Sequence, residues 1–260
     1  MVKSLSEYLA AVNKLNEKMV GNNTTTNIWF RGHENYKWQL TPSIYRHSNL
    51  IVYERDMNRD FKLLSKTLIT SNYPENDFEW LYVMQHYDLP TRLLDWTESS
   101  LVALFFAVEE YTNNVDGMVW LLNPRMYNYL VLQDTNTVPV ATSPFVKDYI
   151  LKPDNGSKPT RTVDAKYPLA IRPTKNSARI LAQRGVFTIH GNKDVCIKEH
   201  IDQNNFGNYS ILNGIKIDGK SKLSILNELY QCGISPSVLF PELSRISEEI
   251  VTKYTKFFTP

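Results

Sequence analysis

Apolar and polar positions recur along much of the chain with the spacing of a helix. The apolar side chains of residues 4–19 fall on one stripe, which predicts an opening amphipathic helix. Similar periodicity predicts helices over 53–70 and 77–87, and the wholly apolar segment 101–108 is typical of a helix buried on most sides. The apolar face expected for the second of these helices consists of Phe61, Leu64 and Leu68.

Other segments have the pattern of strands. The aromatic segment 27–32 stops at a glycine, and 185–191 is also strand-like. Both faces of 118–122 are apolar, which predicts a central strand. The stretch 134–176 is rich in Pro, Thr, Asn and Asp and has poor periodicity, so we expect long loops with short strands there.

The chain shows no internal repeat, low-complexity tract or clean linker. We therefore expect one domain of mixed α and β content over residues 1–260, with an N-terminal helix and loop at 1–26. A C-terminal helical tail at 221–260 has two amphipathic stretches separated at Gly233, which has the position of a residue just after a helix. These stretches either complete the core or form a dimer surface.

Composition narrows the class of protein. The 260 residues are 42% hydrophobic, which is enough for a core. The 29 basic and 27 acidic residues nearly balance, so the net charge does not indicate a polyanionic partner. Cys196 and Cys232 are too few for a disulfide framework or a cysteine-rich metal site and suit a reducing compartment. The start of the chain lacks the apolar run of a secretory signal, and no segment reaches about 18 apolar residues, so we expect a cytoplasmic protein without a membrane span.

The densest group of polar residues lies between two apolar helices, in QHYDLPTRLLDWTESS at 85–100. Polar groups beside a core cost about 1–3 kcal/mol each unless they are paired. They therefore either satisfy one another or hold a ligand. In the structural alternative, Arg92 pairs with Asp95, and Thr97 or Ser99 caps the following helix. The candidate site residues in this segment are His86, Tyr87, Arg92, Asp95, Trp96 and Thr97.

Two further positions are candidates. Arg31 ends the aromatic strand and has donors that suit phosphate or carboxylate, and Gly32 allows a ligand or another backbone to come close. Pairing of Arg31 with a carboxylate such as that of Asp95 is an equal alternative. Gln183 precedes the strand at 185–191, where its amide could read a heterocycle edge or bind backbone.

Several kinds of chemistry are not expected. The chain has no glycine-rich phosphate loop, no HExxH motif and no nucleophile-elbow serine. Its five histidines lack the spacing of metal ligands. We therefore expect neither a metal cofactor nor serine hydrolysis.

Four segments of the chain resemble the FRG domain family, which is named for an N-terminal Phe-Arg-Gly, here residues 30–32. They are WFRGHENYKWQLTPSIYR (29–46), WLYVMQHYDLPTRLLDWTESSLVALFFAV (80–108), SARILAQRGVFTIHG (177–191) and GISPSVLFPEL (233–243). The family is widespread in bacteria and their phages. The resemblance implies a toxin, a phage-defence effector or a counter-defence factor.

A second resemblance is to ADP-ribosyltransferases with an Arg, Ser-Thr-Ser and Glu signature. WFRG is similar to their first element, and Asp95, Trp96 and Thr97 stand in place of Ser-Thr-Ser. This resemblance implies an α+β fold with a split, mostly antiparallel sheet flanked by helices. Arg179, or Gln183 in another frame, stands where the catalytic Glu is wanted, so His86 and Asp95 are the leading substitutes.

The resemblances and the residues together give two functional hypotheses. In the first, an enzyme uses NAD as substrate and either cleaves it or transfers ADP-ribose to a protein or nucleic-acid acceptor. His86, Asp95 and Gln183 would be catalytic, and Arg31 would hold phosphate. The further nucleotide-binding candidates are Gly32, Tyr87, Arg92, Trp96 and Thr97, with Tyr87 or Trp96 stacking on a ring. In the second hypothesis, a non-catalytic module binds or senses a nucleotide or a nucleic-acid end. Both leave the acceptor and the oligomeric state open.

Overall fold

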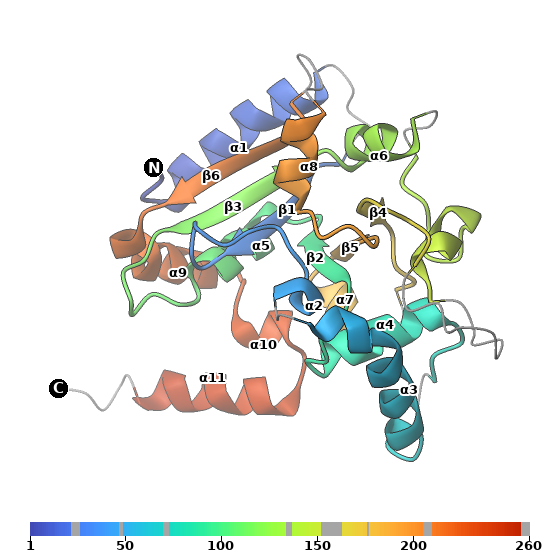
Figure 1. Ribbon diagram of the computed structural model, residues 1–260. Coiled ribbons are helices and arrows are strands. Elements are labelled where there is room, and N and C mark those ends of the chain that lie inside the picture. Colours follow the sequence, from blue (N-terminus) through green and yellow to red (C-terminus); the bar gives the residue numbers. More distant parts are fainter. Residues whose placement is uncertain are drawn as a thin grey trace, which may run out of the picture.

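One antiparallel sheet forms the centre of the computed structural model (Figure 1), which describes residues 1–21, 27–46, 49–69, 73–133, 137–151, 163–175, 177–204 and 210–255. Within these residues the sheet has six strands in the order β4-β5-β2-β1-β3-β6. The strands are β1 (Trp29–His33), β2 (Leu93–Thr97), β3 (Gly117–Leu122), β4 (Leu169–Ile171), β5 (Gly185–Ile189) and β6 (Leu212–Ile217).

Helices cover both faces of the sheet. The covering helices are α1 (Leu5–Val20), α4 (Asp77–His86), α5 (Ser100–Val108), α6 (Pro124–Leu132), α8 (Ile197–Gln203) and α9 (Lys222–Gln231). On one face, Phe30 and Leu121 pack against α1, α5 and α9, while Leu93 and Phe187 pack against α4. On the other face, Trp29 packs with α6 and α8. The predicted α+β class with an antiparallel sheet and flanking helices is therefore confirmed.

The strongly periodic segments fold as predicted. Residues 4–19, 77–87 and 101–108 correspond to α1, α4 and α5, and the predicted central strand is β3, which lies between β1 and β6. The loop-rich segment 134–176 contains, in its described part, β4 and a short 3-10 helix, η2 (Pro144–Tyr149). No helix of the described residues is long and apolar enough to cross a bilayer.

The helix predicted over 53–70 is the main departure. The helix observed there, α3, is shorter and spans Glu54–Ser65 after a 3-10 helix, η1 (Leu50–Tyr53), while residue 70 lies outside the described residues. The expected apolar face is mostly in water. The side chains of Leu64 and Leu68 are 78% and 79% exposed. Figure 1 shows α3 projecting beyond the sheet edge, so only Phe61 of this face packs against the core.

The C-terminal tail has two different parts. The first, α9, completes the core through Ile225 and Leu229, and Gly233 follows it with φ 78°, as its position predicted. The second part comprises the short α10 (Pro236–Leu239) and then α11 (Leu243–Thr255), which buries none of its side chains. The other short helical segments are α2 (Ser43–Arg46), α7 (Ala178–Ala182) and η3 (Gly219–Ser221).

Three buried histidines predict how stability depends on pH. Burial lowers the pKa of His33 to about 2, of His190 to about 3 and of His200 to about 4, and neighbouring arginines add to the effect for the first two. An unfolded histidine has a pKa near 6.5, so the unfolded chain binds these protons more tightly than the folded protein does. The free energy of unfolding should therefore fall as the pH drops below about 6.5, by up to about 1.4 kcal/mol per pH unit for each histidine.

Urea unfolding at pH 7, 6 and 5 measures this slope, and the His200→Gln variant should reduce it by about one proton. An unchanged slope in that variant would show that His200 is not held neutral by burial.

Candidate functional site

The candidate site lies where β1 and β2 separate. These strands share a single register pair, Phe30 with Thr97, whereas β1 pairs with β3 along its whole length. Arg31 crosses the gap that follows, and its Nη1 donates a hydrogen bond to the main-chain carbonyl of Asp95 at 2.6 Å. An arginine side chain thus bonds a β2 carbonyl where a neighbouring strand would ordinarily supply a backbone N–H.

The guanidinium of Arg31 is fixed from two sides. Its Nε donates to Nε2 of His33 at 3.0 Å, and Nη1 lies 3.7 Å from the carboxylate of Asp95. The lowered pKa of His33, caused mainly by burial, keeps this imidazole neutral and able to accept. Burial and the charge of Arg46 lower the pKa of Arg31 to about 10, against the raising effect of Asp95, so Arg31 stays charged at neutral pH. Its Nη2 makes no hydrogen bond within the described part of the chain.

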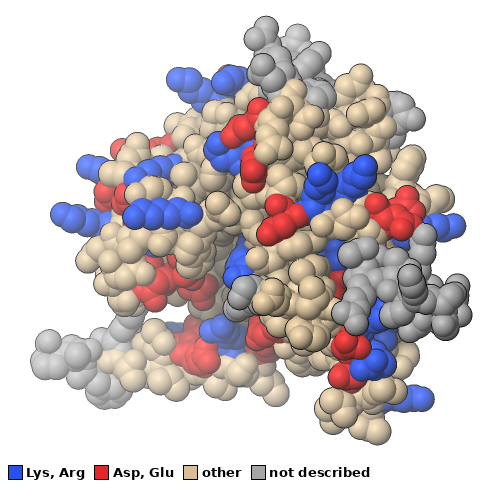
Figure 2. Space-filling view, viewed as in Figure 1, with Lys and Arg blue, Asp and Glu red and all other residues tan. Residues whose placement is uncertain are grey.

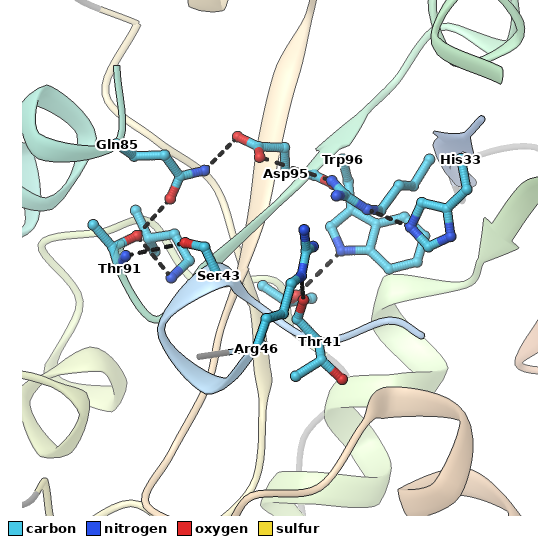
Figure 3. Close-up of polar contacts among 11 residues, drawn as sticks. His33, Thr41, Ser43, Arg46, Gln85, Thr91, Asp95 and Trp96 are labelled. Carbon is cyan, nitrogen blue, oxygen red and sulfur yellow. Dashed lines mark hydrogen bonds and ion pairs between the residues drawn. The ribbon is translucent and has the colours of Figure 1, made fainter. Parts of the chain in front are cut away.

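Asp95 is exposed on β2 and connects this strand to α4 (Figure 3). Its Oδ1 accepts a hydrogen bond from Nε2 of Gln85 at 2.6 Å, and Oε1 of Gln85 accepts one from the hydroxyl of Thr91 at 2.5 Å. Gln85 lies in the last turn of α4, which ends at His86, and Asp88 just beyond it adopts a left-handed conformation with φ 61°. The end of α4 therefore holds the Asp95 carboxylate in one orientation.

A second arginine comes from α2. The exposed side chain of Arg46 points toward Asp95 in Figure 3, and its Nε donates to the carbonyl of Thr41 at 2.8 Å. Partial desolvation by the surrounding groups lowers the pKa of Arg46, and the charge of Asp95 opposes this effect. Two guanidinium groups from β1 and α2 therefore face one carboxylate.

These groups line a cavity of about 780 Å³. Its wall is formed by both sides of the β1–β2 gap together with parts of α2, α4 and α7, and it includes Trp38 from the loop after β1. The predicted site residues that line the cavity are Arg31, Gly32, His86, Tyr87, Asp95, Trp96, Thr97 and Gln183. The fold thus brings together residues that are more than 150 positions apart in the chain.

Arg92 is elsewhere. Its side chain is 2% exposed and forms a two-pronged ion pair with Glu54, while Nη1 donates to the carbonyls of His190 and Gly191 at 3.0 Å each. The predicted ion pair of Arg92 with Asp95 is wrong. Side chains three positions apart on an extended chain point to opposite faces, so these two residues diverge. Arg92 also lies outside the cavity lining.

Three cavity residues are already engaged by the protein. A Cβ on Gly32 would lie 2.0 Å from the carbonyl oxygen of Ala103, so this glycine allows α5 to approach β1. The indole Nε1 of Trp96, which is buried, donates to the hydroxyl of Thr188 at 3.1 Å. Thr97 donates to the carbonyl of Gln183 at 2.7 Å and accepts from the backbone of Ser99, the residue that caps α5. These residues therefore shape the cavity wall, and of the two rings predicted to stack on a ligand, Tyr87 and Trp96, only Tyr87 is exposed, at 66%.

Two residues of the cavity lining, His86 on α4 and Arg179 on α7, lie near one carboxylate of the C-terminal segment. Nε2 of His86 lies 3.9 Å from Glu242, and Arg179 lies 4.0 Å from the same carboxylate. Burial and Arg179 lower the pKa of His86, with Glu242 opposing, so His86 is neutral at neutral pH and can accept a proton. Gln183 is tied to this segment, because its Nε2 donates to the carbonyl of Leu239 at 3.1 Å.

The structure adds residues that sequence patterns had not assigned. Gln85 opens the polar segment and Arg46 ends the first FRG-like segment, so both stood within recognised motifs. The hydrogen bond of Gln85 with Asp95 spans 10 positions of sequence and the electrostatic interaction of Arg46 with Asp95 spans 49, and both arise only from the fold. Trp38 gave no separate signal, because aromatic residues are frequent in this part of the chain.

Residues 26–116 match the family model described as the FRG domain. The chain contains an FRG domain. The match covers β1, α2, α4, β2 and α5, and so includes both arginines, Gln85, His86 and Asp95 of the cavity. The strands β3 to β6 and the C-terminal helices follow the matched FRG domain. No curated protein and no solved structure matches the chain, so the likeness to ADP-ribosyltransferases stays a prediction.

Proposed function

We propose that the cavity binds a nucleotide of the NAD class through its phosphates, and that the protein cleaves the nicotinamide–ribose bond or transfers ADP-ribose from it. The observation that carries the proposal is the convergence of Arg31 and Arg46 on the carboxylate of Asp95, which places two guanidinium groups beside one acidic side chain in a cavity of about 780 Å³. Guanidinium groups bind phosphate through paired, charge-assisted hydrogen bonds. The volume is also usual for a small-molecule site.

The chemistry would use Asp95 and His86. In NAD the leaving group is a cationic pyridinium, so the glycosidic bond breaks with both electrons passing to nicotinamide, which leaves neutral. The Asp95 carboxylate, held by Gln85, would stabilise the positive charge that develops on the ribose. Water or an acceptor nucleophile then forms the new bond to the ribose carbon and gives its proton to neutral His86.

Gln183 fits a supporting role in this scheme. Its side chain has no basic atom, and its amide nitrogen is bonded to Leu239. Asp95 and His86 would therefore perform the functions that the catalytic glutamate has in ADP-ribosyltransferases. The presence of Gln183 where a catalytic glutamate is wanted also favours a second candidate function, a module that binds the nucleotide without turnover.

Long duplex nucleic acid suits this surface less well. Figure 2 shows basic and acidic side chains interspersed over the face that contains the C-terminal helix, rather than gathered by sign. Phosphate contacts along a duplex normally need a clustered basic face.

Asp95→Asn should separate binding from turnover. The substitution keeps the size of the side chain and its contact with Gln85 but removes the charge, so nicotinamide release should fall at least about 100-fold while the NAD dissociation constant changes little. The measurements are titration calorimetry with NAD and chromatographic detection of nicotinamide. Asp60→Asn, on α3 and outside the cavity, is the matched control and should leave both unchanged.

Three outcomes are informative. Loss of nicotinamide release only in Asp95→Asn supports the enzyme. Saturable NAD binding by the wild type without nicotinamide release favours the binding module. If wild-type protein does not bind NAD at all, the proposed function is wrong.

A further inference from the structure

We propose that Trp38 is the stacking surface for the base of the bound nucleotide, and that the site consequently accepts nucleoside diphosphates with little preference among bases. This inference rests on the proposed nucleotide site and adds to it the class of group recognised at one end of the cavity.

The exposure of Trp38 sets it apart from the other tryptophans. It is 49% exposed, whereas Trp29, Trp80 and Trp96 are at most 7% exposed and Trp120 is half-buried. Tryptophan buries more apolar area than other residues, so half a ring left in water at the wall of a cavity is costly unless something covers it. Because Trp38 lines the cavity, a ligand in that cavity can cover it.

The loop that carries Trp38 is held in place by its own backbone. The amide of Trp38 donates to the carbonyl of Asn35 at 3.1 Å, and the amide of Lys37 donates to Oδ1 of the same asparagine at 3.0 Å. The amide of Tyr36 donates to Asp116, next to the start of β3, at 2.9 Å. The ring is therefore presented on an ordered turn, which lowers the entropy lost when a flat group stacks on it.

The indole ring is also linked to the phosphate clamp. The ring of Trp38 meets that of His33 edge-on, with centroids 6.1 Å apart, and His33 accepts the hydrogen bond from Nε of Arg31. A base on Trp38 would thus lie one side chain away from the guanidinium proposed to hold phosphate. That spacing matches a nucleotide, in which a ribose separates base from phosphate.

The position of Trp38 gives the bound nucleotide a direction. In Figure 3, His33 lies on one side of Asp95 and Gln85 on the other. The ring of Trp38 contacts that of His33, whereas the exposed Tyr87 lies two residues after Gln85, at the end of α4. The base would therefore bind at the Trp38 end, the phosphates near the arginines, and the scissile bond near Asp95. Stacking uses the face common to all bases, so it distinguishes nucleotide from phosphate but not one base from another.

The test compares three probes on the wild type and three variants, with a fourth variant as the control. Dissociation constants are measured by titration calorimetry for ADP, GDP and inorganic pyrophosphate with wild type, Trp38→Ala, Trp38→Phe and Arg46→Gln. Trp38→Ala should weaken ADP and GDP alike, by about 5- to 150-fold, and leave pyrophosphate within about twofold. Trp38→Phe should retain most of the affinity, and Arg46→Gln should weaken all three probes.

Tyr53→Ala is the matched control, because its ring is 54% exposed but lies outside the cavity, and it should bind every probe as wild type does. Equal weakening of ADP and pyrophosphate in Trp38→Ala would overturn the inference, since Trp38 would then act only by supporting the His33–Arg31 pair. Unchanged ADP affinity, or a strong preference for one base that Trp38→Ala abolishes, would overturn it too. Pyrophosphate binding with no extra affinity for ADP contradicts the Trp38 inference alone, whereas failure of all probes on wild type contradicts the nucleotide site itself.

Discussion

Gly32→Ala is expected to lower the free energy of unfolding by about 3 kcal/mol, a large fraction of the stability of a typical domain. A Cβ at this position would lie 2.0 Å from the carbonyl oxygen of Ala103 and 2.8 Å from the backbone nitrogen of Ala107. Both atoms belong to the backbone of α5, so relief requires β1 and the helix to move apart. Urea unfolding of the wild type and the variant measures the difference.

Gly185→Ala is the matched control for this prediction. It also lies in the sheet, at the start of β5, but its added Cβ would have no neighbour closer than 3.6 Å, an ordinary contact with Ile180. The change should therefore stay within about 0.5 kcal/mol of wild type. Similar losses at Gly32 and Gly185 would show that the close approach of α5 is not what requires glycine in the motif.

Arg92→Met is expected to lower the free energy of unfolding by about 3–5 kcal/mol. The guanidinium and the Glu54 carboxylate are each 2% exposed, and the arginine also satisfies two carbonyls. Removing it leaves a carboxylate without its partner in a medium that solvates charge poorly. Chemical unfolding of the wild type and the variant at pH 7 is the measurement.

The double variant Arg92→Met with Glu54→Leu tests the cause. If stability is lost because the Glu54 carboxylate is left buried without a partner, the second substitution should restore most of the free energy of unfolding. Well-packed apolar pairs often replace buried ion pairs without loss of stability. Arg59→Met is the control for removing an arginine in general. Its pairs with Asp56 and Asp60 are exposed, so it should change stability by less than about 1 kcal/mol. A loss in the double variant as large as in Arg92→Met would argue that the carbonyl contacts matter more than the charge.

Local periodicity was a good guide where a helix or strand faces the core along one stripe, as in α1, α4, α5 and β3. It failed for α3, because periodicity reports that a segment has an apolar side but not that anything lies opposite that side. Leu64 and Leu68 have the right spacing and still remain in water.

The candidate site shows the same limit for polar residues. The sequence indicated that Arg31 and the 85–97 segment carry chemistry, and it offered Asp95 as one partner of Arg31, which the fold confirms at 3.7 Å. It misassigned Arg92, since nothing in local spacing identifies Glu54, 38 positions earlier, as the closer carboxylate. Long-range partners are fixed by topology, which only the assembled sheet supplies.

The three residues of the Phe-Arg-Gly motif have separate reasons to be there. Phe30 is buried in the core beneath α1 and α5, and Gly32 admits the backbone of α5. Arg31, between them, points to the opposite face and bonds β2. The motif therefore combines two residues required for packing, Phe30 and Gly32, with one residue that supplies a charged group, Arg31. Substitutions of Phe30 or Gly32 should act on stability first.

The narrow junction between β1 and β2 has a consequence for cooperativity. One half of the sheet, β4-β5-β2, meets the other, β1-β3-β6, through one register pair and the side chain of Arg31. A ligand that binds the guanidinium of Arg31 must change its hydrogen bond to β2, and with it the interaction between the two half-sheets. By linkage, a change in that interaction alters the affinity for the ligand by an equal free energy. Occupancy of the cavity and the cohesion of the two half-sheets are therefore thermodynamically inseparable in this protein.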